Sequence, residues 1–117
     1  MSGVVKVAGV QMEPRLLEKE ENLSLCLEMI RVTAKAGARL IVFPECALTG
    51  YVFNSLEEAA PMAEPIPGPS TEKMLDACRE FNVYVIVGLL EREAAVVFNS
   101  AASWDPGCGY PARAGRK

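Results

Sequence analysis

The feature that most constrains this fold is a set of short, uninterrupted apolar runs separated by two amphipathic segments. The longest run is "VYVIVGLL", Val83–Leu90, far shorter than the roughly 20 residues that a membrane-spanning helix needs. Continuous apolar runs of this kind are typical of strands that are buried on both faces of a sheet. The sequence therefore predicts a layered α/β fold in which both sheet faces must be covered.

The runs and amphipathic segments predict the order strand–helix–strand–helix–strand–strand. The expected strands are Val4–Met12, Leu40–Phe43, Asn82–Glu91 and Val96–Trp104, and the expected helices are Leu17–Ala38 and a segment that begins with a cap at Ser70 or Thr71 and ends near Phe81. Crossovers of the same right-handed sense place both helices on one face of the sheet. The other face has no cover in this sequence, which suggests that the chain is part of something larger.

Two segments are expected to be irregular. The connection Glu45–Pro69 carries four prolines in its second half, and a loop this long in a compact domain is usually functional. The end of the chain, Asp105–Lys117, is rich in Gly and Pro, is basic and shows no hydrophobic period. We therefore expect one folded unit over residues 1–104, followed by a Gly/Pro-rich basic loop or tail over 105–117.

Composition excludes several classes of protein. Histidine is absent, which removes Ser-His-Asp triads, Cys-His dyads and His-ligated metal sites. No two of the four cysteines form a C-x-x-C pair, so a zinc ribbon or thioredoxin-type motif is not supported. The formal net charge of -3 offers no basic field for nucleic acid or for an anionic membrane.

The cysteines and the N-terminus bear on localisation. Four free thiols fit a reducing compartment, and we expect Cys26 and Cys78 to be small apolar residues of the core. The N-terminal "VVKVAGVQM" is typical of a strand and lacks the basic and apolar regions of a signal peptide. We therefore expect a cytoplasmic protein that does not span a membrane.

Glu45 is the strongest candidate for a functional residue. It follows the apolar run "LIVF" and the break at Pro44, and open α/β sheets place ligand-binding groups just beyond the carboxyl ends of their strands. A partly desolvated carboxylate in that position can act as a general base; the alternative is a solvated loop glutamate. Because neighbouring residues at a strand end point to opposite sides, we expect Cys46 to face away from Glu45 and to lie either in the core or directly behind the residues that contact substrate.

Four pieces of the sequence resemble the N-terminal part of the nitrilase (carbon–nitrogen hydrolase) superfamily. They span nearly the whole chain and read "VKVAGVQM", "GARLIVFPECALTGY", "PIPGPSTEKMLDACREFNVYVIVGLLER" and "FNSAASWDPG". The second piece is highly specific, and the order of the four strengthens the match. The resemblance implies the first half of a four-layer α-β-β-α sandwich.

The resemblance also implies a chemistry. Its "F-P-E" glutamate, the general base of a Glu-Lys-Cys triad, maps onto Glu45, and its lysine maps onto Lys117 through the match to "GRK". In such enzymes a cysteine thiolate attacks an amide, N-carbamoyl or nitrile carbon and forms a thioester that water then cleaves. No metal or organic cofactor is implied.

The nucleophilic cysteine of the resemblance has no counterpart in this sequence. Cys108 precedes the lysine match and Cys46 adjoins the base, so neither stands in the right order. The leading hypothesis is an incomplete carbon–nitrogen hydrolase that supplies the base for a small amide, N-carbamoyl or nitrile substrate. The alternative is a non-catalytic α/β module that associates through its uncovered sheet face. With either hypothesis we expect self-association, no turnover by this chain alone and no nucleic-acid partner.

Overall fold

The computed structural model describes residues 3–50, 53–107 and 112–116, and for Leu56 and residues 112–116 it describes the backbone alone. The elements in chain order are β1 (Val7–Gly9), α1 (Lys19–Lys35), β2 (Leu40–Val42), α2 (Leu56–Ala59), the 3-10 helix η1 (Ala60–Met62), α3 (Pro69–Phe81), β3 (Tyr84–Glu93), β4 (Val96–Trp104) and β5 (Ala112–Arg116). The predicted order strand–helix–strand–helix–strand–strand is found in β1, α1, β2, α3, β3 and β4, while α2, η1 and β5 are additional elements. No helix within the described part of the chain is long and apolar enough to cross a membrane.

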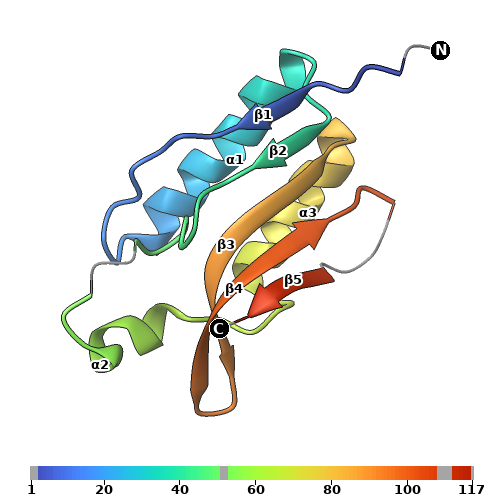
Figure 1. The fold of residues 1–117 in the computed structure, drawn as a ribbon. Helices are drawn as coiled ribbons and strands as arrows, with labels where there is room; N and C mark the ends of the chain where they lie inside the picture. The colour runs from blue at the N-terminus through green and yellow to red at the C-terminus, as the bar shows by residue number, and fades with distance from the viewer. Residues whose placement is uncertain (1–2, 51–52, 108–111, 117) are drawn as a thin grey trace.

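The strands form one sheet in the order β1-β2-β3-β4-β5 (Figure 1). β1, β2 and β3 run parallel. After β1 and after β2 a helical connection returns the chain to the end of the sheet where each of these strands begins. β3, β4 and β5 are antiparallel neighbours. The two-residue turn between β3 and β4 consists of Ala94 and Ala95, and Ala94 has a left-handed backbone with a φ of 55°. That conformation explains how a tight turn forms here without the Gly or Asn that two-residue hairpin turns favour.

α1 and α3 lie side by side on one face of the sheet, as predicted (Figure 1). The core between the helices and the sheet takes one residue of every two along each strand, as the alternation of a strand requires. The strand residues in this core include Ile41, Val85, Val87, Leu89, Ala102 and Trp104. Cys26 and Cys78 are fully buried in the same core, which confirms the role expected of these thiols.

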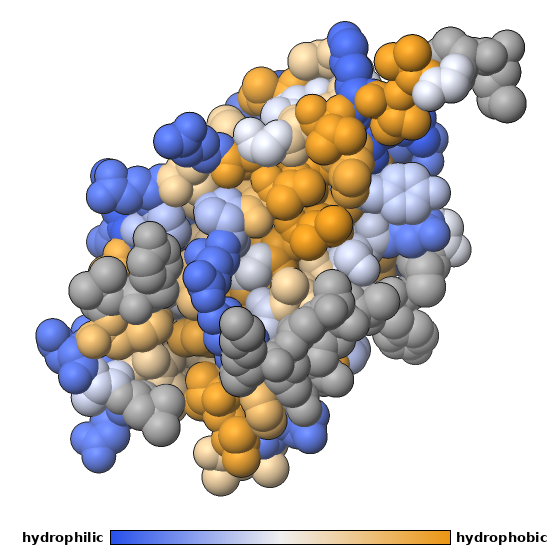
Figure 2. Space-filling model, in the orientation of Figure 1, coloured by the Kyte–Doolittle hydropathy of each residue, from blue (hydrophilic) through white to orange (hydrophobic). Residues whose placement is uncertain are grey.

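The opposite sheet face is open. Val7 is 60% exposed and Tyr84 is 45% exposed, and Leu40, Val42 and Ile86 remain partly exposed on the same face. Figure 2 shows apolar side chains gathered over this side of β1, β2 and β3. The arrangement is one helical layer on one sheet, which is half of an α-β-β-α sandwich and agrees with the expected fold class.

Three expectations about local structure were wrong. The connection Glu45–Pro69 was expected to be irregular, but it contains the short helices α2 and η1. Residues 105–117 were expected to be a loop or tail, but Ala112–Arg116 form β5, which pairs with β4. An edge strand is held by backbone hydrogen bonds to its neighbour, so it needs no apolar period. The helix expected to begin with a cap at Ser70 or Thr71 is α3. It begins at Pro69 with Gly68 as its N-cap, so Ser70 and Thr71 lie inside its first turn.

Candidate active site

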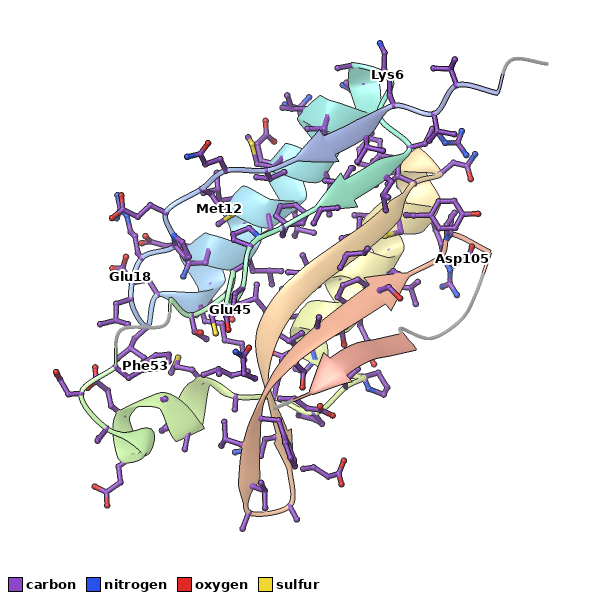
Figure 3. All side chains as sticks on the ribbon, viewed as in Figure 1. Lys6, Met12, Glu18, Glu45, Phe53 and Asp105 are labelled. Carbon is purple, nitrogen blue, oxygen red and sulfur yellow. The ribbon has the colours of Figure 1, made fainter. Side chains whose placement is uncertain are left out.

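Glu45 lies just beyond the carboxyl end of β2, where its side chain is exposed (Figure 3). The parallel pairing of β2 with β3 continues past Val42, because the Phe43 N–H donates to the Ile86 carbonyl over 2.8 Å. Pro44 then ends the strand, since it has no N–H to continue the ladder. The predicted position of Glu45 at the end of a sheet strand is therefore found in the structure.

The turn that carries Glu45 is fixed to two other parts of the molecule. The Gly88 N–H donates to the Pro44 carbonyl over 3.3 Å, and the Ala47 N–H donates to the Gly88 carbonyl over 2.9 Å. On the other side, the buried Asn22 of α1 donates from Nδ2 to the Leu48 carbonyl over 2.8 Å. Backbone hydrogen bonds from β3 and a side-chain hydrogen bond from α1 make the position of Glu45 well defined although its side chain faces solvent.

Gly88 permits this close approach of the turn to β3. A Cβ atom at Gly88 would lie 2.6 Å from the Glu45 Cα atom, closer than Cβ atoms approach in folded proteins, and 3.0 Å from the Cys46 nitrogen, which is tighter than most Cβ contacts. Cys46 itself has a φ of 49°, a left-handed conformation that is uncommon for residues other than glycine. The chain turns sharply directly after Glu45, and the glycine in the neighbouring strand makes room for that turn.

Asn99 of β4 contacts both Glu45 and Cys46. Its Nδ2 donates a hydrogen bond to the Glu45 carboxylate, and its Oδ1 accepts a weak hydrogen bond from the Cys46 thiol, with 3.9 Å between sulfur and oxygen. Sequence reasoning did not assign Asn99 a role. The signal available was its place in the segment "FNSAASW", but only the sheet register shows which residue it faces.

The prediction for Cys46 was right about burial and wrong about direction. Cys46 is 3% exposed and packs in a small apolar cluster with Ala59, Ala63 and Leu90. It nevertheless faces the same amide as Glu45, because the left-handed turn ends the alternation on which the prediction relied. Burial and then the negative charge of Glu45 raise the pKa of the Cys46 thiol to about 11.

The other described thiols are also poor nucleophiles. Burial raises the pKa of Cys26 and of Cys78 to about 12, and only a thiolate attacks a carbon efficiently. Cys108 and Lys117 lie outside the described residues. β5 ends at Arg116 opposite Ser100, the residue that follows Asn99 in β4.

A second polar cluster, which sequence reasoning also missed, lies around Glu64. The Glu64 carboxylate is 3% exposed and accepts hydrogen bonds from the Ser70 N–H over 2.7 Å and the Ser70 hydroxyl over 2.8 Å. It also forms an ion pair with Lys19. These contacts join the first turns of α1 and α3 to the end of the long connection, so the cluster stabilises the packing of these three segments.

The residues that the structure describes contain no group of three or more His, Cys, Asp or Glu side chains that is arranged to hold a metal ion. The arrangement at the strand end is instead an exposed carboxylate with a neutral amide and a protonated thiol behind it. Such a carboxylate can accept a proton from a group that approaches from the open side of the sheet.

Known proteins resemble this chain in sequence. The nitrilase of Pyrococcus abyssi (strain GE5 / Orsay) is 40% identical over 104 residues, which cover 88% of this chain and 40% of the relative. Omega-amidase NIT2 of Bos taurus is 35% identical over 75% of this chain and 31% of its own length. The chain thus spans well under half the length of these relatives.

Solved structures give the same result. The structure of an N-terminal amidase with a Gln-Val peptide matches 93% of this chain and 27% of its own, with a TM-score of 0.78 and 26% identity. A CN-hydrolase superfamily protein from Xanthomonas campestris matches 93% of this chain and 39% of its own with a TM-score of 0.79; at 20% identity it supports the fold alone. The sequence pattern of the carbon-nitrogen hydrolases matches residues 6–113, and the chain therefore belongs to the carbon-nitrogen hydrolase family.

Proposed function

We propose that this chain supplies the general base of a hydrolase that cleaves carbon–nitrogen bonds through a Glu-Lys-Cys triad. Glu45 is the base, Lys117 is the lysine, and the nucleophile is a cysteine that these 117 residues do not provide. The observation that carries the proposal is the exposed Glu45 carboxylate, held at the carboxyl end of a parallel strand by a turn anchored on both sides.

The proposed reaction needs one base that acts twice. The Glu45 carboxylate takes the proton of the attacking thiol, the thiolate adds to the amide carbon, and the protonated Glu45 returns that proton to the departing amine. In the second half, Glu45 takes a proton from the water that attacks the thioester carbon. The acid is released, and the proton that Glu45 holds returns to the cysteine sulfur.

The lysine would stabilise the negative charge that develops on the substrate. The described part of β5 supports Lys117 for this role, because Arg116 pairs with Ser100, the neighbour of the Asn99 that contacts Glu45. Lys117 directly follows Arg116 in sequence. Figure 1 shows the described chain ending at the same end of the sheet as the turn after β2.

The three described thiols support a nucleophile from elsewhere. Cys26, Cys46 and Cys78 are buried, and their pKa values are raised to between about 11 and about 12. A thiol that stays protonated and inaccessible cannot attack a substrate. Cys108 precedes Lys117, which is the reverse of the order that the family resemblance implies.

The names of the relatives, which are nitrilase, omega-amidase and N-terminal amidase, support nitrile and amide substrates, and the family resemblance of the sequence adds N-carbamoyl compounds. We propose a small molecule with an amide, N-carbamoyl or nitrile group, and these three chemistries can be compared directly by the release of ammonia or amine.

The test is a completed enzyme, made by joining this chain to the remainder of the Pyrococcus abyssi relative. We expect it to hydrolyse at least one member of a panel of amides, N-carbamoyl amino acids and nitriles, whereas the 117-residue chain alone gives no turnover. In the completed enzyme, Glu45→Gln is expected to lower kcat at least about 10²–10⁴-fold, because Gln cannot accept the thiol proton.

Thermal stability of the Glu45→Gln variant is expected to change little, since Gln has the same shape and the side chain is exposed. Glu45→Asp is also expected to lose activity, because its shorter arm withdraws the base from hydrogen-bond reach. Lys117→Met tests the lysine assignment in the same assay. Retention of activity by Glu45→Gln within a few-fold would show that Glu45 is a structural residue.

A second candidate function is a non-catalytic module that associates through its open sheet face. The exposed Val7 and the partly exposed Leu40 and Val42 favour it. Turnover by the completed enzyme, together with its loss in Glu45→Gln, would decide for the hydrolase.

A further inference from the structure

The Asn99 side chain uses both of its polar ends at the candidate active site. Its Nδ2 donates to the Glu45 carboxylate, and its Oδ1 accepts from the Cys46 thiol. Because burial and the nearby Glu45 charge raise the pKa of Cys46 to about 11, this thiol keeps its proton near neutral pH and acts as a donor. A donor at one end of the amide leaves the NH2 group to face the carboxylate.

Asn99 and Cys46 are both held more firmly than the Glu45 side chain. Asn99 lies in β4 directly opposite Leu90 of β3, and Leu90 packs against Cys46 in the small apolar cluster. Cys46 is buried and shares the tight turn with Glu45. Asn99, which is held in the sheet, therefore contacts the exposed carboxylate directly, and the buried Cys46 thiol contacts the other end of the Asn99 amide.

We propose that Asn99 is a positioning residue that fixes the Glu45 carboxylate, and that the Cys46 thiol fixes the orientation of the Asn99 amide. This inference rests on the proposed function, because the group being fixed is the proposed base. An exposed glutamate otherwise rotates about three side-chain bonds, and a misplacement of about 1 Å at a reacting group can cost about 10²-fold in rate.

The first test uses the 117-residue chain and needs no catalysis. Asn99→Asp replaces the donating NH2 group by a second carboxylate oxygen that faces Glu45, so we expect a lower urea midpoint of unfolding. Adding Glu45→Gln is expected to restore the midpoint, because the Gln amide then donates to the new Asp. A residue that did not contact Glu45 would show no such rescue, and equal midpoints for the single and double variants would overturn the proposed contact.

The second test uses the completed enzyme. Asn99→Leu has a similar shape without hydrogen bonds, and we expect kcat to fall about 10²-fold while KM changes little. In a Glu45→Gln background the same change is expected to cost almost nothing further, since residues that act as a unit are not additive. Losses that multiply in the double variant would overturn the positioning role.

The Cys46 link has its own pair of variants. Cys46→Ser keeps a donor for the Asn99 amide and is expected to retain kcat within a few-fold, whereas Cys46→Ala removes the donor and is expected to lower kcat more. Equal values for the two variants would overturn this link. The matched control for Asn99→Leu is Asn54→Leu, which makes the same amide-to-apolar change at an exposed loop position.

The two proposals fail in different ways. A completed enzyme with no turnover on any substrate would contradict the proposed function, yet the rescue of Asn99→Asp by Glu45→Gln in the 117-residue chain would still support the contact. An active enzyme in which Asn99→Leu keeps full kcat would contradict the positioning role and leave the hydrolase standing.

Discussion

The two faces of the sheet are made from the same strands and largely the same residue types, yet they differ in burial. Ile41 and Val85 face the helices and are fully buried, while their sequence neighbours Leu40 and Tyr84 face the open side and remain partly or largely exposed. Because hydrophobic stabilisation scales with the apolar area removed from water, a strand residue here stabilises the fold according to its face more than its type.

The candidate active site lies where these two environments meet. The turn after β2 is anchored to α1 through Asn22 and to β3 through Gly88, so the well-packed part of the molecule fixes the backbone of Glu45. The Glu45 side chain itself remains exposed. A rigid backbone with an accessible side chain is what a general base requires.

The largest expected difference between the two faces is in truncation of neighbouring residues of β2. Ile41→Ala removes fully buried methyl and methylene groups and is expected to lower the free energy of unfolding by about 2–5 kcal/mol. Leu40→Ala, on the open face, is expected to cost less than about 1 kcal/mol. Urea denaturation of both variants measures the contrast, and equal losses would show that the open face is as well packed as the covered one.

Gly88 and Gly9 are two strand glycines at which an added methyl group is expected to have different effects on stability. Gly88→Ala would place a methyl group 2.6 Å from the Glu45 Cα atom, and we expect a loss of about 1–3 kcal/mol of unfolding free energy. Gly9→Ala is the matched control, since no atom lies within 4 Å of the added Cβ.

In the completed enzyme, Gly88→Ala is also expected to lower kcat, because the turn that carries Glu45 must move. If Gly88→Ala kept full stability and kcat, the turn would be more adaptable than its hydrogen bonds indicate.

Much of the covered face could be predicted from sequence, because burial on one side imposes a readable period. The apolar runs gave the strands, and the spacing of Cys26 and Ile30, which are fully buried on α1, gave the helix. β5 could not be predicted, since its residues Ala112–Arg116 carry no apolar alternation and its place depends on pairing with β4.

The candidate site also has features that the sequence predicts and features that depend on strand pairing. Glu45 could be predicted, because a carboxylate after an apolar strand and a proline is a local pattern. Its contact with Asn99 could not, since 54 residues separate them and only the sheet register brings them together. Gly88 offered a partial signal, because a glycine inside a strand often marks a close approach of another backbone.

The buried thiols of the covered face predict a pH dependence. Cys26 and Cys78 have folded pKa values of about 12, above their ordinary value of 9.0, so the folded chain keeps protons that the unfolded chain releases between these limits. Their contribution to stability is fully present below about pH 9 and is lost as pH rises toward 12, by about 1.4 kcal/mol per pH unit for each thiol.

Urea denaturation at about pH 8 and about pH 10 measures this loss. The Cys78→Ala variant is the control: it is expected to be less stable at the lower pH, because it leaves a cavity, but to lose less stability between the two. Identical losses in the variant and the parent chain would show that Cys78 ionises as easily in the folded chain as in the unfolded one.

The smallest expected effect on stability is that of a charged residue introduced on the open face. Such a substitution is expected to change self-association but to leave the free energy of unfolding nearly unchanged. Val7 is 60% exposed, so Val7→Lys is expected to alter the free energy of unfolding by less than about 0.5 kcal/mol. The same lysine would lie on the open face in register with Leu40 and Tyr84, and association that buries this apolar face gains about 25 cal/mol per Å². We therefore expect the 117-residue chain to self-associate in sedimentation velocity experiments, and Val7→Lys to shift it toward the monomer.

Val32→Lys, at a 44% exposed position on α1, adds the same charge on the helical side and is expected to leave association unchanged. Equal shifts for the two variants would point to net charge as the cause, and a parent chain that is monomeric at all concentrations would show that the open face does not associate with itself.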